Sequence, residues 1–225
     1  MIRVFVGFDP IESVTFHVLS NSIRRYSSMP VSITPVSLNN LTGILDRPRH
    51  PLQSNDFSFS RFLVPWMCNY EGWALFMDCD MLFRDDIAKL WAHRDDKYAV
   101  KCVHHNHIPE ETEKFLGNVQ TKYSRKNWSS VILFNNAKCK ALTPEYVNAA
   151  DGLDLHQFRW LEDEEIGYLP NVWNHLVGYQ PMKEEAKNVH FTTGGPYFEE
   201  YRNCDYHQEW FAEKALMEFV EKGKK

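Results

Sequence analysis

The sequence predicts a single α/β domain over residues 1–225, in which a mainly parallel central sheet is flanked by helices. Residues 2–8 form a nearly continuous apolar run, typical of a strand buried on both faces. An amphipathic helical segment and a second short strand at 31–36 follow, which together make a βαβ unit. A third apolar run covers residues 73–77, and no Gly/Ser-rich linker divides the 225 residues.

The helix of this first unit has clear start signals. Asp9 can cap it, Pro10 suits the first helical position, and Glu12 completes a capping box. Helical spacing then places four residues on one face: Phe16, Leu19, Ile23 and Tyr26. The unit ends at Pro30.

The remaining elements follow in order along the chain. We expect a helix over 58–69, limited or kinked by Pro65, and a helix begun by Asp85 and Asp86 with Ile87, Leu90 and Trp91 on its apolar face. Further strands are predicted at 73–77, 98–103 and 131–134, and loops at 37–57 and 104–127. The chain should end in an amphipathic helix over 209–222, whose apolar residues are Phe211, Leu216, Phe219 and Val220.

Composition excludes several classes of protein. The net charge is −5 and basic residues cluster only at Lys222, Lys224 and Lys225, which argues against a nucleic-acid-binding protein. Five cysteines without a CxxC pair predict no disulfide framework and a reducing compartment. No signal peptide and no apolar run of about 20 residues is visible, so we expect a cytoplasmic protein without a transmembrane segment.

The most informative motif is the pair Asp78 and Asp80, which lies between the apolar runs 73–77 and 81–83. Burying one unpaired carboxylate costs several kcal/mol, and two close together also repel each other. A divalent cation such as Mg²⁺ or Mn²⁺ would neutralise both. The pair follows a strand, and ligands of open α/β sheets bind beyond the carboxyl ends of strands. The alternative is that both residues are turn and cap residues.

A second signal lies far downstream, where His190 precedes the pair Gly194 and Gly195. A neutral imidazole can complete a metal site, and a glycine-rich turn lets backbone N–H groups approach a phosphate. The alternative is a structural histidine before an ordinary turn. When His190 is considered together with the acidic pair, the sequence favours a metal ligand and a structural histidine equally.

At these residues the chain resembles the retaining glycosyltransferases of family 8, the group that includes glycogenin, on the GT-A fold. The resemblance implies a GT-A (Rossmann-like) domain, with a nucleotide-binding part over about 1–103 and an acceptor and sugar part over about 104–225. It also implies that Asp78, Asp80 and His190 hold Mn²⁺ or Mg²⁺, with Asp78 also contacting the donor.

The same resemblance suggests further donor contacts. Segment 58–65 matches the family's basic helix, so Arg61 would reach the nucleotide-sugar as a catalytic and binding residue; the alternative is a surface salt bridge. Phe8 and Asp9 would contact the base, although helix capping also explains Asp9. Gly194 and Gly195 would lie at the diphosphate.

Two more segments are similar to family motifs. Asn127 and Ser130 would lie near the sugar hydroxyls, and Asp163 falls on the family's Asp-Gln motif as a catalytic candidate; the alternative for Asp163 is a solvated acidic face. The family's diphosphate lysine is missing after the late histidine. The residues that could replace it are Arg61, Lys101, Arg125 and Lys126.

The function that the resemblance implies is metal-dependent transfer of a hexose from a UDP-sugar to a glycan or small-molecule acceptor, with retention of configuration. Two alternatives stay open. A haloacid-dehalogenase-type phosphatase also carries Asp-x-Asp at a strand end with Mg²⁺, and a nucleotide-sugar-binding module without catalysis would keep the same residues.

Overall fold

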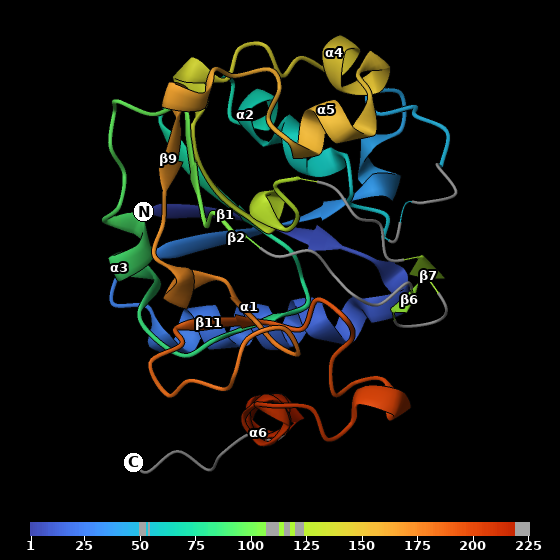
Figure 1. Cartoon of the computed structure of the whole chain (residues 1–225), viewed down its shortest axis with the longest axis vertical. Coiled ribbons are helices and arrows are strands. Elements are labelled where there is room, and N and C mark those ends of the chain that lie inside the picture. The colour runs from blue at the N-terminus through green and yellow to red at the C-terminus, as the bar shows by residue number, and fades with distance from the viewer. Residues whose placement is uncertain (50–52, 54, 107–112, 115–117, 120–123, 219–225) are drawn as a thin grey trace.

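A six-stranded mixed sheet forms the centre of the protein (Figure 1). The computed structural model describes residues 1–49, 53, 55–106 and 124–218, together with the backbone of 113–114 and 118–119. The strand order is β2-β1-β3-β8-β5-β9. The strands are β1 (Ile2–Phe8), β2 (Val31–Ser37), β3 (Trp73–Met77), β5 (Val100–Cys102), β8 (Val131–Asn135) and β9 (Ile166–Tyr168).

The prediction of a mainly parallel sheet is confirmed. β1 pairs in parallel with both β2 and β3, and β5 pairs in parallel with β9. β8 alone runs antiparallel to its two neighbours in this sheet, β3 and β5. The apolar runs predicted as buried strands are indeed buried, because helices cover both faces.

Figure 1 shows α1 (Ser13–Tyr26) on one face of the sheet, and α2 (Val64–Met67), α4 (Pro144–Ala149) and α5 (Gly152–His156) on the other. α6 (His207–Glu218) packs outside α1, and α3 (Ile87–Trp91) lies at one end of the sheet. The start of the first helix is a 3-10 turn, η1 (Pro10–Glu12), in which Asp9 accepts from the Ile11 N–H at 2.9 Å. The predicted cap is therefore confirmed.

A second, three-stranded sheet was not predicted. It has the order β10 (His175–Leu176), β11 (Asn188–His190), β4 (Met81–Phe83). β4 pairs antiparallel with β11, and the register places His190 opposite Met81. This pairing brings a late segment of the chain next to the acidic pair that precedes β4.

Two helix predictions need correction. The expected helix over 58–69 is split into η3 (Ser60–Leu63) and α2, because Pro65 occupies the first turn of α2. On α6 the buried side chains are Trp210 and Glu213, whereas Leu216 is 46% exposed; Phe219 and Val220 lie outside the described residues. Glu213 is buried because Asn21 and Arg25 of α1 donate to its carboxylate.

The connections between these elements contain short 3-10 turns. The turns are η2 (Leu38–Leu41), η5 (Trp128–Ser130), η6 (Asn136–Lys138), η7 (Asp163–Glu165), η8 (Asn171–Trp173) and η9 (Glu199–Tyr201).

Part of the predicted loop 104–127 lies outside the described residues. Its described backbone includes the paired strands β6 (Glu113–Lys114) and β7 (Asn118–Val119).

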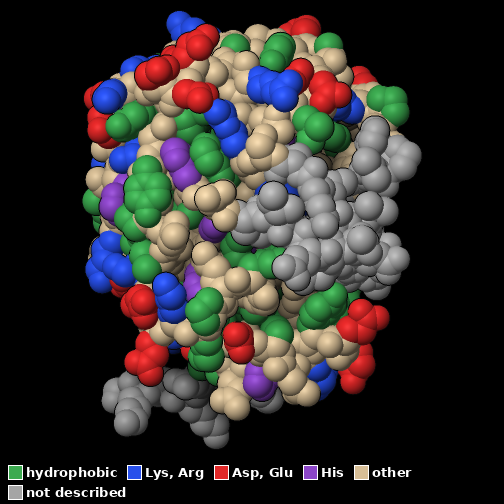
Figure 2. Space-filling view, in the orientation of Figure 1, with side chains coloured by type: hydrophobic (Ala, Val, Ile, Leu, Met, Phe, Trp, Pro, Cys, Tyr) green, Lys and Arg blue, Asp and Glu red, His purple; other side chains and the backbone are tan. Residues whose placement is uncertain are grey.

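The surface agrees with the balanced composition. Lys and Arg side chains are interspersed with Asp and Glu side chains over the face shown in Figure 2. Within the described ranges, no helix has both the length and the apolar character needed to cross a bilayer.

Candidate functional site

Asp78, Asp80 and His190 converge at the carboxyl end of β3. Their ligand atoms lie within 4.8 Å of one another, the one such group of three among the residues that the structure describes. His190 Nε2 is 3.3 Å from Asp80 Oδ1 and 3.9 Å from Asp78 Oδ2. The β4–β11 pairing causes this approach, and the Phe191 N–H extends it by donating to the Asp80 carbonyl at 2.9 Å.

Between the two aspartates, the chain turns Cys79 into the core, where it is 0% exposed. Burial, followed by the charges of Glu12 and Asp80, raises the pKa of the Cys79 thiol well above its usual range. The thiol therefore stays protonated at neutral pH and supplies no thiolate ligand. The alternation leaves two carboxylates on the side of the chain that faces His190.

Arg61 is buried beside Asp78, so it is not a surface ion pair. Its Nη1 lies 2.7 Å from Asp78 Oδ1 and donates to the Ser129 carbonyl at 2.8 Å, while Nε donates to the Ser58 carbonyl at 3.0 Å. The guanidinium also lies over the Phe76 ring, 5.0 Å from its centroid. These contacts fix the position of the Asp78 carboxylate.

Asn174 orients the His190 ring. The Ser130 hydroxyl donates to the Asn127 carbonyl at 2.7 Å, so its lone pair accepts from Asn174 Nδ2 at 2.8 Å. Asn174 Oδ1 consequently faces His190 Nδ1 at 3.0 Å and accepts its proton. In the neutral ring, this hydrogen bond places the proton on Nδ1 and leaves Nε2, which faces the carboxylates, as the nitrogen able to bind a metal. Sequence reasoning missed Asn174, because its partners lie far from it in the chain.

The chemistry of this group fits a divalent cation. Two carboxylate oxygens and one imidazole nitrogen are donors suited to Mn²⁺, with Mg²⁺ as the harder alternative. Asp78 and His190 are 8% and 2% exposed, and Asp80 is half-buried, so a bound cation would be partly shielded from water. A ring already held by a hydrogen bond is typical of metal-binding histidines.

Phe8 and Asp9, the residues predicted for the base, lie at the end of β1. The Phe8 ring packs edge-on against Phe16 at 5.6 Å. Both oxygens of Asp9 accept backbone N–H groups, from Ile11 at 2.9 Å and from Asp56 at 3.0 Å. These contacts give Asp9 a structural role, and its contact with a base stays a prediction.

Gly194 and Gly195 follow His190 in a tight turn. The Gly194 N–H donates to the Phe191 carbonyl at 2.9 Å, and its φ of +136° is strained for any other residue. A Cβ on Gly195 would lie 2.4 Å from the Tyr197 ring. The turn therefore needs both glycines for close packing, directly after His190.

Asp163 is not brought into this group. Its side chain is 76% exposed and pairs with Arg125 at 2.5 Å. Of the other basic candidates for the diphosphate, Lys126 is 8% exposed and Lys101 is half-buried in β5. The catalytic role of Asp163 stays a prediction.

Sequence reasoning also missed His156. Its Nδ1 lies 2.8 Å from the Ser129 hydroxyl, and its ring packs against Phe59 and Phe62. Burial, followed by the charges of Arg61, Lys126 and Arg47, lowers the pKa of His156 well below its usual range, so the ring is neutral at pH 7. No motif in the sequence singles out this histidine.

Comparison with known proteins places these observations in a wider context. No family model matches the chain. The chain is 47% identical to the Protein CDI of Arabidopsis thaliana over 232 residues, which covers 99% of this chain and 89% of that protein.

Solved structures identify the fold. The apo structure of the bifunctional glycosyltransferase WbbM superposes with a TM-score of 0.67 at 14% identity, and the Streptococcus pneumoniae glycosyltransferase GlyE with 0.62 at 13%. The match covers 95% of this chain in both cases but only 49% and 60% of those chains. The galactosyltransferase LgtC, solved with donor and acceptor sugar analogues, gives 0.58 at 11% identity and 98% coverage of both chains. The predicted GT-A fold is thus confirmed.

Proposed function

The chain belongs to the same family as the Arabidopsis thaliana Protein CDI, and from its fold and its acidic site we propose that it is a cation-dependent glycosyltransferase. The reaction would move a hexose from a UDP-sugar to a glycan or small-molecule acceptor with retention of configuration. The observation that most strongly supports this proposal is the convergence of Asp78, Asp80 and His190 at the carboxyl end of β3 on a GT-A fold.

In this proposal Asp78, Asp80 and His190 hold Mn²⁺ or Mg²⁺. The bound cation would act as a Lewis acid that neutralises the charge developing on the diphosphate leaving group. Arg61 holds the Asp78 carboxylate in place, and it adds positive charge next to the expected diphosphate. Asn174 holds the His190 ring in its metal-binding tautomer.

The sugar would lie next to Asn127 and Ser130. Asn127 Nδ2 is buried and has no hydrogen-bond partner within the described part of the chain. A buried donor of this kind needs an acceptor, and a sugar hydroxyl can supply one. Asn127 also occupies the left-handed region at φ +64°, a strain consistent with a functional position.

Retention would follow if the acceptor attacks from the side of the leaving group. The new C–O bond then forms on the face from which the diphosphate departs, and the diphosphate oxygen takes the acceptor proton. Asp163 is the candidate for stabilising the oxocarbenium-like centre, in which case its exposed pair with Arg125 must open.

The test compares two matched substitutions, Asp80→Asn and Asp85→Asn, in calorimetric titrations of Mn²⁺, followed by titrations of UDP with and without Mn²⁺. Asp85 lies five residues away in a pair with Lys89 and Lys187. We expect Asp80→Asn to weaken Mn²⁺ binding more than about 100-fold, since changes in residues that merely orient a ligand already cost 10–100-fold. Asp85→Asn should leave it within about twofold.

Turnover separates the remaining functions. We expect Mn²⁺-dependent hydrolysis of a UDP-hexose by the wild-type chain, lost in Asp80→Asn. Hydrolysis of a simple phosphomonoester instead would favour the phosphatase, and UDP-sugar binding without any hydrolysis would favour the non-catalytic module. Wild-type binding of UDP that is indifferent to Mn²⁺ would remove the cation site from the proposal.

A further inference from the structure

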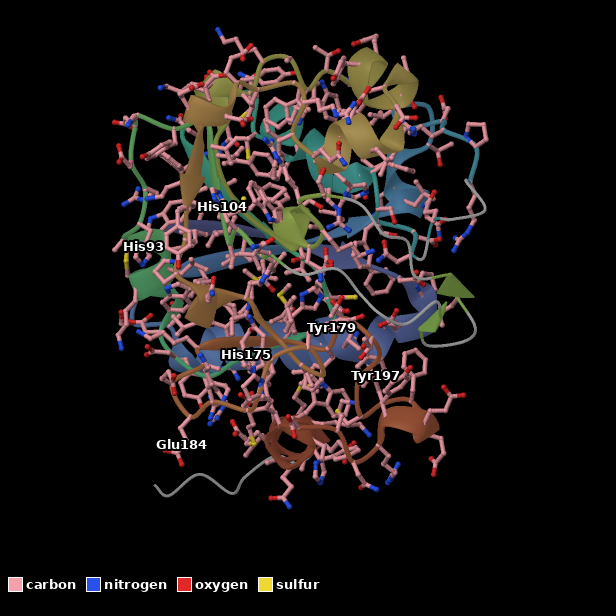
Figure 3. All side chains as sticks on the ribbon, viewed as in Figure 1. His93, His104, His175, Tyr179, Glu184 and Tyr197 are labelled. Carbon is pink, nitrogen blue, oxygen red and sulfur yellow. The ribbon has the colours of Figure 1, made fainter. Side chains whose placement is uncertain are left out.

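A buried hydrogen bond joins Glu12, near the start of the chain, to Tyr197, near its end. The Tyr197 hydroxyl donates to Glu12 Oε2 at 2.9 Å, across 185 residues of sequence. Glu12 is only 4% exposed. Figure 3 labels Tyr197 on the segment that leads from β11 towards η9, close to α1. The predicted capping role of Glu12 is thus replaced by a long-range contact.

Tyr197 sets the shape of the glycine turn. Its ring packs so closely on Gly195 that an added Cβ there would lie 2.4 Å from a ring carbon. On its other sides the ring packs against Phe198 at 4.8 Å and Trp210 at 5.6 Å. A shift of Tyr197 would therefore shift Gly195 with it.

The turn is fixed at two points. At one end, the Phe191 N–H donates to the Asp80 carbonyl at 2.9 Å. At the other end, Tyr197 reaches Glu12, which lies three residues after Asp9 and whose carbonyl accepts from Thr15 Oγ1 at 2.7 Å. The segment therefore spans from the metal-binding aspartate to the end of β1.

The Tyr197 hydroxyl remains a donor at any working pH. Burial raises the pKa of this phenol well above its usual range, and the charges of Glu12 and Asp80 raise it further. A hydrogen bond to a carboxylate is stronger than one between neutral groups. The contact is thus a permanent part of the folded chain around neutral pH.

We propose that Glu12 and Tyr197 are positioning residues that hold the Gly194–Gly195 turn against the diphosphate of the donor. The inference rests on the proposed function, because it takes the donor to be a nucleoside diphosphate sugar. Neither side chain is assigned a contact with the substrate. Their effect passes through the turn, in which the Gly194 N–H already donates to the Phe191 carbonyl and the Gly195 N–H would face the second phosphate.

The experiment uses the full chain with saturating Mn²⁺ and two probes, UDP and UMP, in calorimetric titrations. Tyr197→Phe removes only the hydroxyl and keeps the ring packed on Gly195. We expect it to weaken UDP binding about five- to tenfold, the loss of one hydrogen bond to a charged group, and UMP binding less than about twofold. Glu12→Gln keeps an acceptor for the hydroxyl, so we expect a UDP loss of only about two- to threefold.

Tyr168→Phe is the matched control, because the Tyr168 side chain is 53% exposed in β9; both affinities should stay at the wild-type value. Equal losses of UDP and UMP in Tyr197→Phe would mean general loosening and would overturn the inference, as would no loss of either. If the wild-type chain bound no UDP in Mn²⁺, the proposed function and this inference would both fail. If the wild-type chain binds UDP in Mn²⁺ and Tyr197→Phe binds it with the same affinity, only this inference is overturned.

Discussion

Two pairs of aspartates lie within nine residues, and their surroundings differ. Asp85 binds Lys89 at 2.6 Å and Lys187 at 3.1 Å, and Asp86 caps α3 by accepting from the Ala88 N–H at 2.9 Å. Within the described part of the chain, Asp78 and Asp80 instead lie next to Arg61 and the His190 ring.

The difference shows why only one of the two acidic pairs is a candidate ligand site. The second pair has two lysine ammonium groups and a helix N-terminus, so the fold itself neutralises it. The first pair is more deeply placed, and the His190 ring, whose Nδ1 is held by Asn174, points its Nε2 at it. Both pairs consist of aspartates, two residues apart in the first pair and adjacent in the second, and they differ most in the groups that surround them.

The largest effect is expected for Arg61→Ala. It leaves the Asp78 carboxylate buried without its guanidinium, which should lower the free energy of unfolding by about 3 kcal/mol, as for other broken buried pairs. Urea unfolding measures this loss. Millimolar Mn²⁺ should restore part of it, because a bound cation replaces the missing positive charge.

Lys89→Ala is the control in the second pair. Lys89 is 58% exposed and pairs with Asp85 four residues earlier, so its loss should cost less than about 1 kcal/mol and should not respond to Mn²⁺. Equal losses in the two variants would show that the two acidic pairs do not differ as argued.

The next effect is expected for Asn174→Ala, which frees the His190 ring. Mn²⁺ affinity should fall about 10–100-fold, the usual cost of losing a residue that orients a metal ligand. Titration followed by the electron paramagnetic resonance of free Mn²⁺ measures it. Asn148→Ala removes an amide that bridges α4 to the Ile44 carbonyl, and Mn²⁺ affinity should stay unchanged. An unchanged affinity in Asn174→Ala would remove its orienting role.

Local patterns account for what the sequence could predict. The strands at 2–8 and 73–77 follow from apolar runs, and Asp78 and Asp80 were singled out as candidates because their carboxylates lie between such runs. His190 was singled out by the turn that follows it. These signals lie within about ten residues of sequence, where periodicity and chemistry are readable.

Long-range contacts account for what was missed. The β4–β11 pairing joins strands of three residues, too short to show an alternation. Asn174 and Tyr197 act on partners 16 and 185 residues away, so neither has a local pattern. Glu12 shows the limit most clearly: its spacing from Asp9 indicates a capping box, but tertiary packing supplies Tyr197 as a partner.

The smallest effect concerns acid stability at the second pair. Burial pushes the pKa of Asp85 upwards, but hydrogen bonds from Lys89, the Asp86 N–H and Lys187 outweigh it and hold the pKa at about 2, below the ordinary 3.8. Because the folded-state pKa is depressed, the ionised carboxylate stabilises the fold above pH 4, and this contribution is lost as the pH falls towards 2. Asp85→Asn should therefore be less stable than the wild type by under about 1 kcal/mol at pH 7. Urea unfolding at pH 7, 4 and 2 should show this gap shrinking to nothing, and a gap that stays constant would mean that the charge of Asp85 contributes nothing.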